Sequence, residues 1–362
     1  MERKRIILHI DMDAFYANIE IRENPDYNSR PLVVGIGPNI ENFKGVVSTA
    51  SYRAREFGIR SGMSLHQAYL KCKSLIVVPA RISYYRSVSN NIMDILRKFS
   101  DKFEKVSIDE AYIDVSNKID DFSKVYNLIL RIKNEIYNAE RLTCSVGAAP
   151  NKSIAKIASG FKKPSGITIV PPDAVRSFLD PLPVKKIPGV GDKTEKILHK
   201  YNIRKIGDIL NVDRGFLISL LGKPGDKIYD IALGIENFEV KNKKKRKSFG
   251  FSKSFESPTT DTNLIYDKID IFSENLGKKI NENNIMFKTI SITVKYDDFS
   301  SVTKSKTLPN FTNDFNLLNL YAKKLFDELF KNNTKKVKKI GVRVSNFKYI
   351  LKNQSSLKSY FV

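Results

Sequence analysis

Cysteine, histidine and long apolar runs are scarce in this sequence, and each shortage excludes a class of protein. Two cysteines in 362 residues, Cys72 and Cys144, cannot build a disulfide framework and form no CxxC pair. No apolar run approaches the about 20 residues of a membrane-spanning helix, and Ile6 to Ile10 is too short for the apolar core of a signal peptide. The histidines are scattered and show no zinc-ligand spacing: His9, His66 and His199. We therefore expect a cytoplasmic protein with no membrane partner, working where thiols stay reduced.

Acidic residues are also in deficit. The chain has 39 Asp and Glu against 62 Lys and Arg, which leaves a net charge of +23. A surplus of this size creates a positive field that favours a polyanionic partner, although a Lys-rich composition with a solvated basic surface would give the same balance. The hydrophobic content of 41% is sufficient for several cores. A chain of this length is expected to divide into about two to four domains.

The first 170 residues alternate short apolar strands with helices, which indicates an α/β or α+β core. Expected strands are Arg5 to Ile10, Pro31 to Gly35, Gly45 to Thr49, the hairpin arms Lys105 to Ile108 and Ala111 to Val115, and Leu142 to Ala148. Expected helices are Tyr52 to Phe57, ended by Gly58, and Phe122 to Asn138.

The remainder of the chain shows two further patterns. Residues 171 to about 234 are expected to be helical, and the charge run of residues 241–247 is typical of an exposed linker. The last part predicts a β-α-β-β-α-β sheet with both helices on one face. Its strands are Ser248 to Phe255, Lys288 to Tyr296, Ser301 to Leu308 and Lys338 to Phe347, and its helices are Asn263 to Glu282 and Phe315 to Phe330.

Apolar and polar residues alternate along the strands of this last sheet, so its two faces differ. In residues 340–345 the apolar Ile340, Val342 and Val344 point one way, and Lys339, Arg343 and Ser345 point the other. Lys304 and Lys306 share a face of their own strand by the same period of two. A sheet with one buried and one basic face is a good surface for a duplex backbone, but a polar outer face is also normal for an open antiparallel sheet.

Two acidic segments carry the strongest chemical pattern: Asp11-Met-Asp-Ala-Phe-Tyr16 and Ser107-Ile-Asp-Glu-Ala-Tyr112. Carboxylates at a strand end and at a hairpin bend are hard oxygen ligands suited to Mg²⁺. Two such ions can stabilise the attacking and leaving oxygens of a phosphoryl displacement. Either segment alone would more simply be a polar turn or the end of a strand. Their joint occurrence at the ends of apolar strands favours a metal site.

These two segments closely resemble the palm of DNA polymerase IV-like (DinB-type) enzymes of the Y family. The resemblance extends over nearly the whole chain and is closest to archaeal members. It implies an α+β right-hand polymerase with the following parts: palm 1–14 and 82–170, fingers 15–81, thumb 171–236 with a helix-hairpin-helix, basic linker 237–247, little finger 248–347 and tail 348–362.

The resemblance also implies the catalytic groups. Asp11, Asp109 and Glu110 would be the metal-binding carboxylates, with the Met12 carbonyl as a further ligand to two Mg²⁺ ions, for which Mn²⁺ can substitute. Asp13 belongs to the same motif without being assigned as a ligand. Tyr16 matches the steric gate, whose ring excludes a 2′-hydroxyl; from the residues alone it could equally be a core aromatic, a role that suits Phe15 better.

The nucleotide site implied by the resemblance lies on two other segments. In Ser48-Thr-Ala-Ser-Tyr-Arg-Ala-Arg55, Tyr52 and Arg55 would hold the triphosphate, with Thr49 adding a hydrogen bond. An arginine fork suits phosphate oxygens, although an arginine on a helix is usually only solvated. Lys163, in Phe161-Lys-Lys-Pro-Ser-Gly166, corresponds to the lysine that neutralises triphosphate charge.

The DNA-contacting residues are expected on the palm, thumb and little finger. Ile187-Pro-Gly-Val-Gly191 fits the helix-hairpin-helix pattern, in which amides at a helix start bind a backbone phosphate; an ordinary Gly-rich helix start is the alternative. The full set of expected DNA contacts is Lys152, Gly189, Gly191, Lys253, Lys304, Lys306 and Arg343.

The C-terminal segment Gln354-Ser-Ser-Leu-Lys-Ser-Tyr-Phe361 resembles a peptide that binds the sliding clamp. Gln354 would fill a polar pocket and Leu357, Tyr360 and Phe361 an apolar one; a tail packed on its own domain is the alternative. We expect a monomer that extends primer-template DNA with dNTPs at low fidelity and bypasses lesions. A metal-dependent nuclease and a non-catalytic DNA-binding scaffold are the competing hypotheses.

Overall fold

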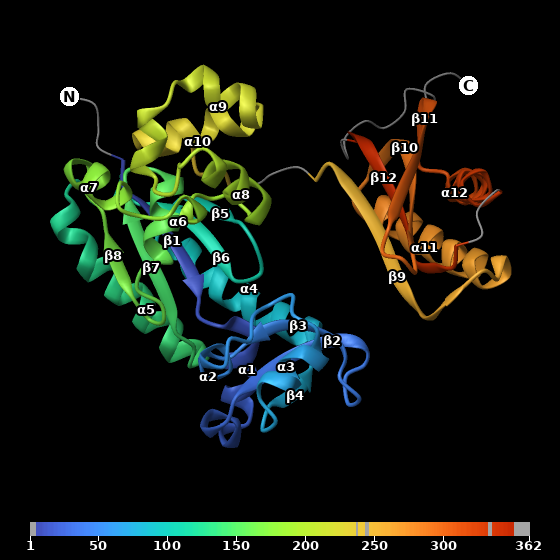
Figure 1. The fold of residues 1–362 in the computed structure, drawn as a ribbon, viewed down its shortest axis with the longest axis horizontal. Helices are drawn as coiled ribbons and strands as arrows, with labels where there is room; N and C mark the ends of the chain where they lie inside the picture. The colour runs from blue at the N-terminus through green and yellow to red at the C-terminus, as the bar shows by residue number, and fades with distance from the viewer. Residues whose placement is uncertain (1–4, 237, 243–245, 332–334, 351–362) are drawn as a thin grey trace, which may run out of the picture. The chain divides into compact units, whose positions relative to one another are not determined.

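The computed structural model describes residues 5–236, 238–242, 246–331 and 335–350. The chain divides into two compact units, Met1–Lys243 and Lys244–Val362 (Figure 1). The boundary between them falls within the segment expected to be a linker.

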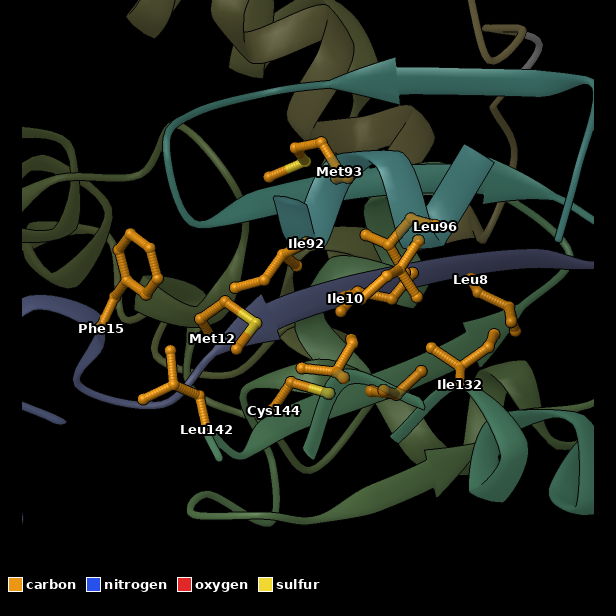
Figure 2. Packing of buried hydrophobic residues seen from close by; sticks show 14 of the residues in the cluster. Leu8, Ile10, Met12, Phe15, Ile92, Met93, Leu96, Ile132, Leu142 and Cys144 are labelled. Atoms are coloured by element: carbon orange, nitrogen blue, oxygen red, sulfur yellow. The ribbon is translucent and has the colours of Figure 1, made fainter. Parts of the chain in front are cut away.

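A five-stranded sheet forms the centre of the first unit, in the order β5-β6-β1-β7-β8. Its strands are β5 (Lys102–Lys105), β6 (Glu110–Asp114), β1 (Ile7–Met12), β7 (Cys144–Ala149) and β8 (Ile167–Ile169). β1 is antiparallel to both β6 and β7. One face of β1 presents Leu8, Ile10 and Met12 to a core that includes Ile92 and Leu96 of α4 (Ile82–Lys98), as Figure 2 shows. α5 (Val125–Glu140) contributes to the same core.

The other face of the sheet is covered by α6 (Lys152–Ser159). This helix lies close to the sheet because Gly147 of β7 has no side chain: a Cβ there would meet the Ala155 carbonyl oxygen at 2.1 Å. Asn151 begins the helix by accepting a hydrogen bond from the Ile154 amide at 3.0 Å. The close approach brings the polar side of α6 to β1 and β6.

A smaller α/β segment interrupts the first sheet in sequence, and its strands β2, β3 and β4 form their own sheet in the order β3-β2-β4. Its elements are α1 (Phe15–Glu23), a 3₁₀ turn (Pro25–Ser29), β2 (Leu32–Asn39), β3 (Lys44–Ala50), α2 (Tyr52–Glu56), α3 (Leu65–Lys71) and β4 (Ile76–Pro79). A separate core that contains Val33, Val47 and Leu65 holds this segment together.

Short helices form the rest of the first unit. They are the 3₁₀ turn Pro172–Ala174, α7 (Val175–Leu179), the 3₁₀ turn Val184–Lys186, α8 (Asp192–Lys200), the 3₁₀ turn Gly207–Asn211, α9 (Arg214–Leu221) and α10 (Lys223–Leu233). They share a core with α6 and with Ile7 of β1. This region is therefore helical, as expected.

The second unit is a four-stranded antiparallel sheet with two helices on one face. Its elements in chain order are β9 (Ser248–Thr259), α11 (Thr262–Glu282), β10 (Ile285–Tyr296), β11 (Ser301–Thr312), α12 (Phe315–Phe330) and β12 (Val337–Tyr349), and the strand order is β11-β10-β12-β9. Ile340, Val342 and Val344 are buried against the helices. The predicted β-α-β-β-α-β arrangement is confirmed.

The expected position of Glu110 was wrong. Glu110 is not at the bend of the hairpin but is the first residue of β6, because it pairs with Asp11 in the central sheet. The first residues of the segment expected to be a linker, 238–242, belong to the first unit. Val240 is buried, and the Asn242 carboxamide accepts from the Phe103 amide at 2.8 Å and donates to the Asp101 carbonyl at 2.9 Å, alongside the edge strand β5.

Candidate active site

Three carboxylates meet at one end of the central sheet. Asp11 of β1 lies directly opposite Glu110 of β6 in the antiparallel pair, and Asp109 precedes Glu110. The Met12 amide donates to the Asp109 carbonyl at 3.0 Å, which fixes the hairpin bend against β1. Since side chains alternate along a strand, Asp11 and Glu110 project from the face opposite the Met12 side chain. Both acidic segments of the sequence therefore contribute to one site.

Lysines hold two of these carboxylates. The Lys163 ammonium contacts Asp11, and the Lys156 ammonium lies 2.6 Å from Glu110 Oε2. Burial, together with the Glu110 and Asp109 charges, raises the pKa of Asp11 to about 6, although Lys163 opposes this shift. The His9 imidazole and the Lys156 ammonium lower the pKa of Glu110 to about 2. The site thus concentrates negative charge that two cations only partly balance.

His9 and Lys156 are site residues that sequence reasoning missed. His9 is buried two positions before Asp11, on the same face of β1, with its Nε2 3.9 Å from Glu110 Oε2. Its Nδ1 lies 2.7 Å from Ser159 Oγ of α6. Burial lowers the pKa of His9, so the ring is neutral at pH 7. His9 could have been found from the sequence, because it is two residues from Asp11 and a strand places such residues on the same face. Lys156 could not, because its position depends on how α6 packs on the sheet.

Asp13 has a structural role distinct from that of Asp11. Its carboxylate is buried and accepts hydrogen bonds from four donors: Ser145 Oγ at 2.7 Å, the Ser165 amide at 2.8 Å, Thr143 Oγ1 at 2.9 Å and Tyr52 OH at 3.2 Å. These bonds use the lone pairs that a metal ligand would need free. The sequence did not predict Asp13 to be a metal ligand, and this arrangement is consistent with that prediction.

The expected nucleotide-binding residues lie on two sides of Asp13. Tyr52 begins α2 and donates to Asp13, and the Arg55 guanidinium carbon stands 4.6 Å from the centre of the Tyr52 ring. Arg55 Nε donates to the Ala50 carbonyl at 3.0 Å. Lys163 lies in the loop whose Ser165 amide donates to the same Asp13. Thr49 is half-buried on β3, opposite Val34.

Tyr16 lies in the first turn of α1, and Phe15 beside it is buried in the same core as Leu8, Ile10 and Met12 of β1 (Figure 2). The Tyr16 ring is only half-buried and stacks on Tyr85 of α4, with ring centres 4.4 Å apart and planes 19° apart. Burial and the Asp109 carboxylate raise the pKa of Tyr16, so its hydroxyl stays protonated at neutral pH. Phe15 is the core aromatic of this pair.

Lys152 does not face outward as expected for a contact to the DNA backbone. Its ammonium lies 2.7 Å from Glu104 Oε2 of β5, and only 13% of its side chain is exposed. It also stands 4.9 Å from the centre of the Tyr112 ring. Because Glu104 is itself buried, this ion pair joins α6 to the sheet and leaves Lys152 poorly placed for a phosphate.

The basic residues of the second unit divide between the two sides of its sheet. Arg343 is paired with Ser291 and Gly250 and lies on the open side, away from α11 and α12. A groove of about 400 Å³ on this side is lined by Ser252, Lys295, Lys339 and Arg343, among others. The open side is therefore basic, but it carries more serine and threonine than lysine.

Three expected DNA contacts lie on the opposite side. Lys304 and Lys306 share a strand face, as expected, but they pair with Ile292 and Ile290, whose side chains face the helices. Lys304 is joined to Glu328 of α12 at 2.5 Å. Lys253 of β9 pairs with the buried Ile340. These lysines flank the helices at the edge strands and do not belong to the open basic side.

The helix-hairpin-helix segment has the backbone that its glycines predict. Gly189 has φ +95°, a conformation that L-residues rarely adopt. Gly191 immediately precedes α8 and has no side chain with which to cap it. The first amides of α8 are therefore accessible to an acceptor from outside the helix.

Two other expectations concern features beyond this site. The clamp-binding residues Gln354, Leu357, Tyr360 and Phe361 lie outside the described residues. Among the helices that the structure describes, none has the length and apolar character needed to cross a membrane.

Comparisons with known proteins match this architecture part by part. The impB/mucB/samB family matches residues 10–160, the IMS family HHH motif residues 172–203, and the impB/mucB/samB family C-terminal domain residues 246–358. DNA polymerase IV 2 of Methanosarcina mazei is 39% identical over 95% of this chain and 93% of its own length. DNA polymerase IV of Streptococcus agalactiae is 38% identical over 91% of this chain and 90% of its own length.

Solved structures of Y-family polymerases have a similar fold. A Y-family DNA polymerase chimera of Dbh and Dpo4 is 32% identical, with a TM-score of 0.88 over 95% of this chain and 100% of its own. DinB from Sulfolobus solfataricus is 32% identical, with a TM-score of 0.67 over the same shares of the two chains.

The fold and the acidic site thus define a DNA-directed DNA polymerase of the right-hand type. The chain belongs to the DNA polymerase IV family of Y-family translesion polymerases. The nuclease and scaffold hypotheses are set aside by this family membership.

Proposed function

We propose that Asp11, Asp109 and Glu110, with the Met12 carbonyl, hold two Mg²⁺ ions that support transfer of a dNMP from a dNTP to a primer 3′-hydroxyl, with pyrophosphate as the leaving group. The observation that carries this proposal is the pairing of Asp11 with Glu110 across β1 and β6, beside Asp109. Hard carboxylate oxygens are the donors that Mg²⁺ prefers, and Mn²⁺ accepts the same donors. When bound, the ions supply Lewis acidity and neutralise charge on the reacting phosphate.

The oxygen donors present are suitable for such ions, although their side chains are not arranged around a common metal position. Within the described residues, no group of three or more such side chains forms a ready metal site. Lys163 and Lys156 instead contact Asp11 and Glu110. Burial raises the pKa of Asp11 although Lys163 opposes the shift, and the neighbouring Glu110 and Asp109 carboxylates add to it. We propose that Lys163 exchanges Asp11 for the triphosphate when a nucleotide binds.

The other groups bind and orient the substrate. We assign Tyr52, Arg55 and Thr49 to the triphosphate, because a guanidinium fork and hydroxyls are suitable donors to its oxygens. Tyr52 would release Asp13 to do so. Tyr16 would lie beneath the sugar and exclude a 2′-hydroxyl. Held in this way, the α-phosphate is presented in line with the primer hydroxyl, so catalysis comes mainly from positioning and electrostatics.

Primer-template DNA is the second substrate, and we propose that the chain acts on it as a monomer. A relative described as an insertion ternary complex of Dbh DNA polymerase and another described as a post-insertion binary complex support nucleotide and DNA binding. The open side of the β9–β12 sheet and the start of α8 are the proposed backbone contacts. Single-nucleotide primer extension with Mg²⁺ tests the proposal: lengthening supports it, whereas shortening or no change contradicts it.

DNA affinity should fall steeply with salt, because the proposed contacts are to phosphates and the net charge is +23. Between 50 and 200 mM salt we expect a loss of about 10²- to 10⁴-fold in affinity, measured by fluorescence anisotropy. Arg343→Gln should lower the slope of log K against log salt by about 1. Lys278→Gln is the matched control, because Lys278 is an exposed lysine on α11 that pairs with Glu274. A flat salt dependence, or equal effects of both variants, contradicts the assignment.

Removal of residues 354–362 should abolish stimulation of synthesis by a sliding clamp and leave basal primer extension unchanged. The reason is that Gln354, Leu357, Tyr360 and Phe361 form the proposed clamp-binding peptide. Synthesis on a long primed template, with and without loaded clamp, measures this. Tyr360→Ala with Phe361→Ala should reproduce the deletion, and stimulation that survives both changes rules the peptide out.

A further inference from the structure

The Tyr16 ring is held by a cluster of side chains from α1 and the start of α4 that have no part in the proposed reaction. Tyr16 and Glu20 are four residues apart on α1, so they lie on the same side of that helix. Arg81 and Tyr85 are four residues apart at the start of α4. These two helix turns bring the four side chains together.

Tyr85 connects the two members of the α1 pair. Its ring stacks on Tyr16 with 4.4 Å between ring centres, and its hydroxyl donates to Glu20 Oε1 at 2.5 Å. Arg81 then holds Glu20 with two bonds, from Nε at 2.9 Å and from an η nitrogen at 2.8 Å. Tyr85 is therefore fixed at its hydroxyl end while its ring supports Tyr16.

The burial of this cluster indicates that its geometry is specific. Tyr85 is fully buried, and only 8% of the Glu20 side chain is exposed. A buried carboxylate is costly unless it is paired and hydrogen-bonded, and here both oxygens have partners. Simple packing against Tyr16 would need only an apolar ring. The polar anchor adds direction, because it restricts the tilt and slide of the Tyr85 ring.

We propose that Glu20, acting through Tyr85, is a positioning residue for Tyr16 and thereby sets how strongly the enzyme rejects ribonucleotides. This inference rests on the proposed gate role of Tyr16. A ring that is held rigidly leaves no room for a 2′-hydroxyl, whereas a ring that can tilt makes room for this hydroxyl at a small cost in free energy. Glu20 and Arg81 thus determine specificity without touching the nucleotide.

The chain contains a matched control next to this cluster. Tyr84 also donates its hydroxyl to a glutamate of α1, Glu23 Oε1, at 2.7 Å. This second tyrosine–glutamate pair is more exposed, and the ring contacts of Tyr84 are with Arg22 and Arg81 instead of Tyr16. Tyr85→Phe and Tyr84→Phe therefore remove the same atom from adjacent residues, and only the first removes the anchor behind Tyr16.

The experiment measures kcat/KM for a dNTP and for the matching rNTP in single-nucleotide extension by the full chain. Tyr85→Phe and Glu20→Gln should each lower the preference for the dNTP by about 3- to 10-fold, whereas Tyr84→Phe leaves it unchanged. A general loss of folding lowers both efficiencies together and leaves their ratio intact. In a Tyr16→Ala background, Tyr85→Phe should have no further effect on the ratio.

Each outcome separates this inference from the gate on which it rests. If Tyr16→Ala relaxes the preference but Tyr85→Phe and Glu20→Gln do not, the positioning role is wrong and the gate stands. If Tyr16→Ala leaves the preference intact, the gate itself fails. An equal change in Tyr84→Phe and Tyr85→Phe also overturns the inference, because it removes the specificity of the Glu20 anchor.

Discussion

Asp109→Ala should lower the rate of primer extension by at least about 10³-fold while primer-template affinity changes little. Asp109 stands at the bend that the Met12 amide fixes against β1, next to the paired Asp11 and Glu110. If Asp109 is a metal ligand as proposed, removing its carboxylate would take that ligand away and leave the reacting phosphate without part of its charge neutralisation. Single-turnover extension at saturating dNTP, over a range of Mg²⁺ concentrations, measures the effect.

A control for this variant is available in the same domain. Asp94 is an exposed carboxylate on α4 that pairs with Arg97, so Asp94→Ala changes the same side chain away from the site. It should extend primers at the wild-type rate. Extension by Asp109→Ala at the wild-type rate would remove Asp109 from the metal site. Restoration of its activity by raising Mg²⁺ alone would show that only metal affinity had been lost.

The elements of the second unit were predictable because local signals agree with the tertiary fold. α12 has the predicted bounds, Phe315–Phe330, and α11 begins one residue before the expected Asn263. Both helices start after an aspartate, Asp314 or Asp261, whose side chain accepts from the first amides of the helix. The alternation in β12 correctly placed Ile340, Val342 and Val344 in the core.

The side of an edge strand was not predictable in the same way. Alternation shows that Lys304 and Lys306 share a face, but which face depends on the register with β10, where they meet Ile292 and Ile290. Long lysine side chains at an edge strand can lie on the helix side because their ammonium groups reach past the core. Lys304 reaches Glu328 of α12 in this way.

The acidic cluster was partly predictable. Apolar strands that end in carboxylates indicated that Asp11 and Asp109–Glu110 would share a site. The partners of these groups could not be derived, because they come from α6 and from the loop before β8. Lys156, Lys163 and Glu104 find their ion-pair partners at sequence separations of 46, 152 and 48 residues. No local pattern encodes such pairs.

Tyr16→Ala should lower the preference for dNTPs over rNTPs by at least about 10²-fold, with kcat/KM for the dNTP changed far less. The expected gate is steric: a rigid ring beneath the sugar overlaps a 2′-hydroxyl. The ring is half-buried and stacked on Tyr85, so it cannot move aside without losing that contact. Alanine leaves a space that the hydroxyl can occupy.

Tyr16→Phe distinguishes a steric gate from a polar one. It keeps the ring and its stack on Tyr85 and removes only a hydroxyl that stays protonated, since burial and Asp109 raise the pKa of Tyr16. A steric gate predicts that Tyr16→Phe retains nearly the full sugar preference while Tyr16→Ala loses it. If both variants lose the preference equally, the hydroxyl carries the selection. If neither does, sugar selection lies elsewhere in the nucleotide site.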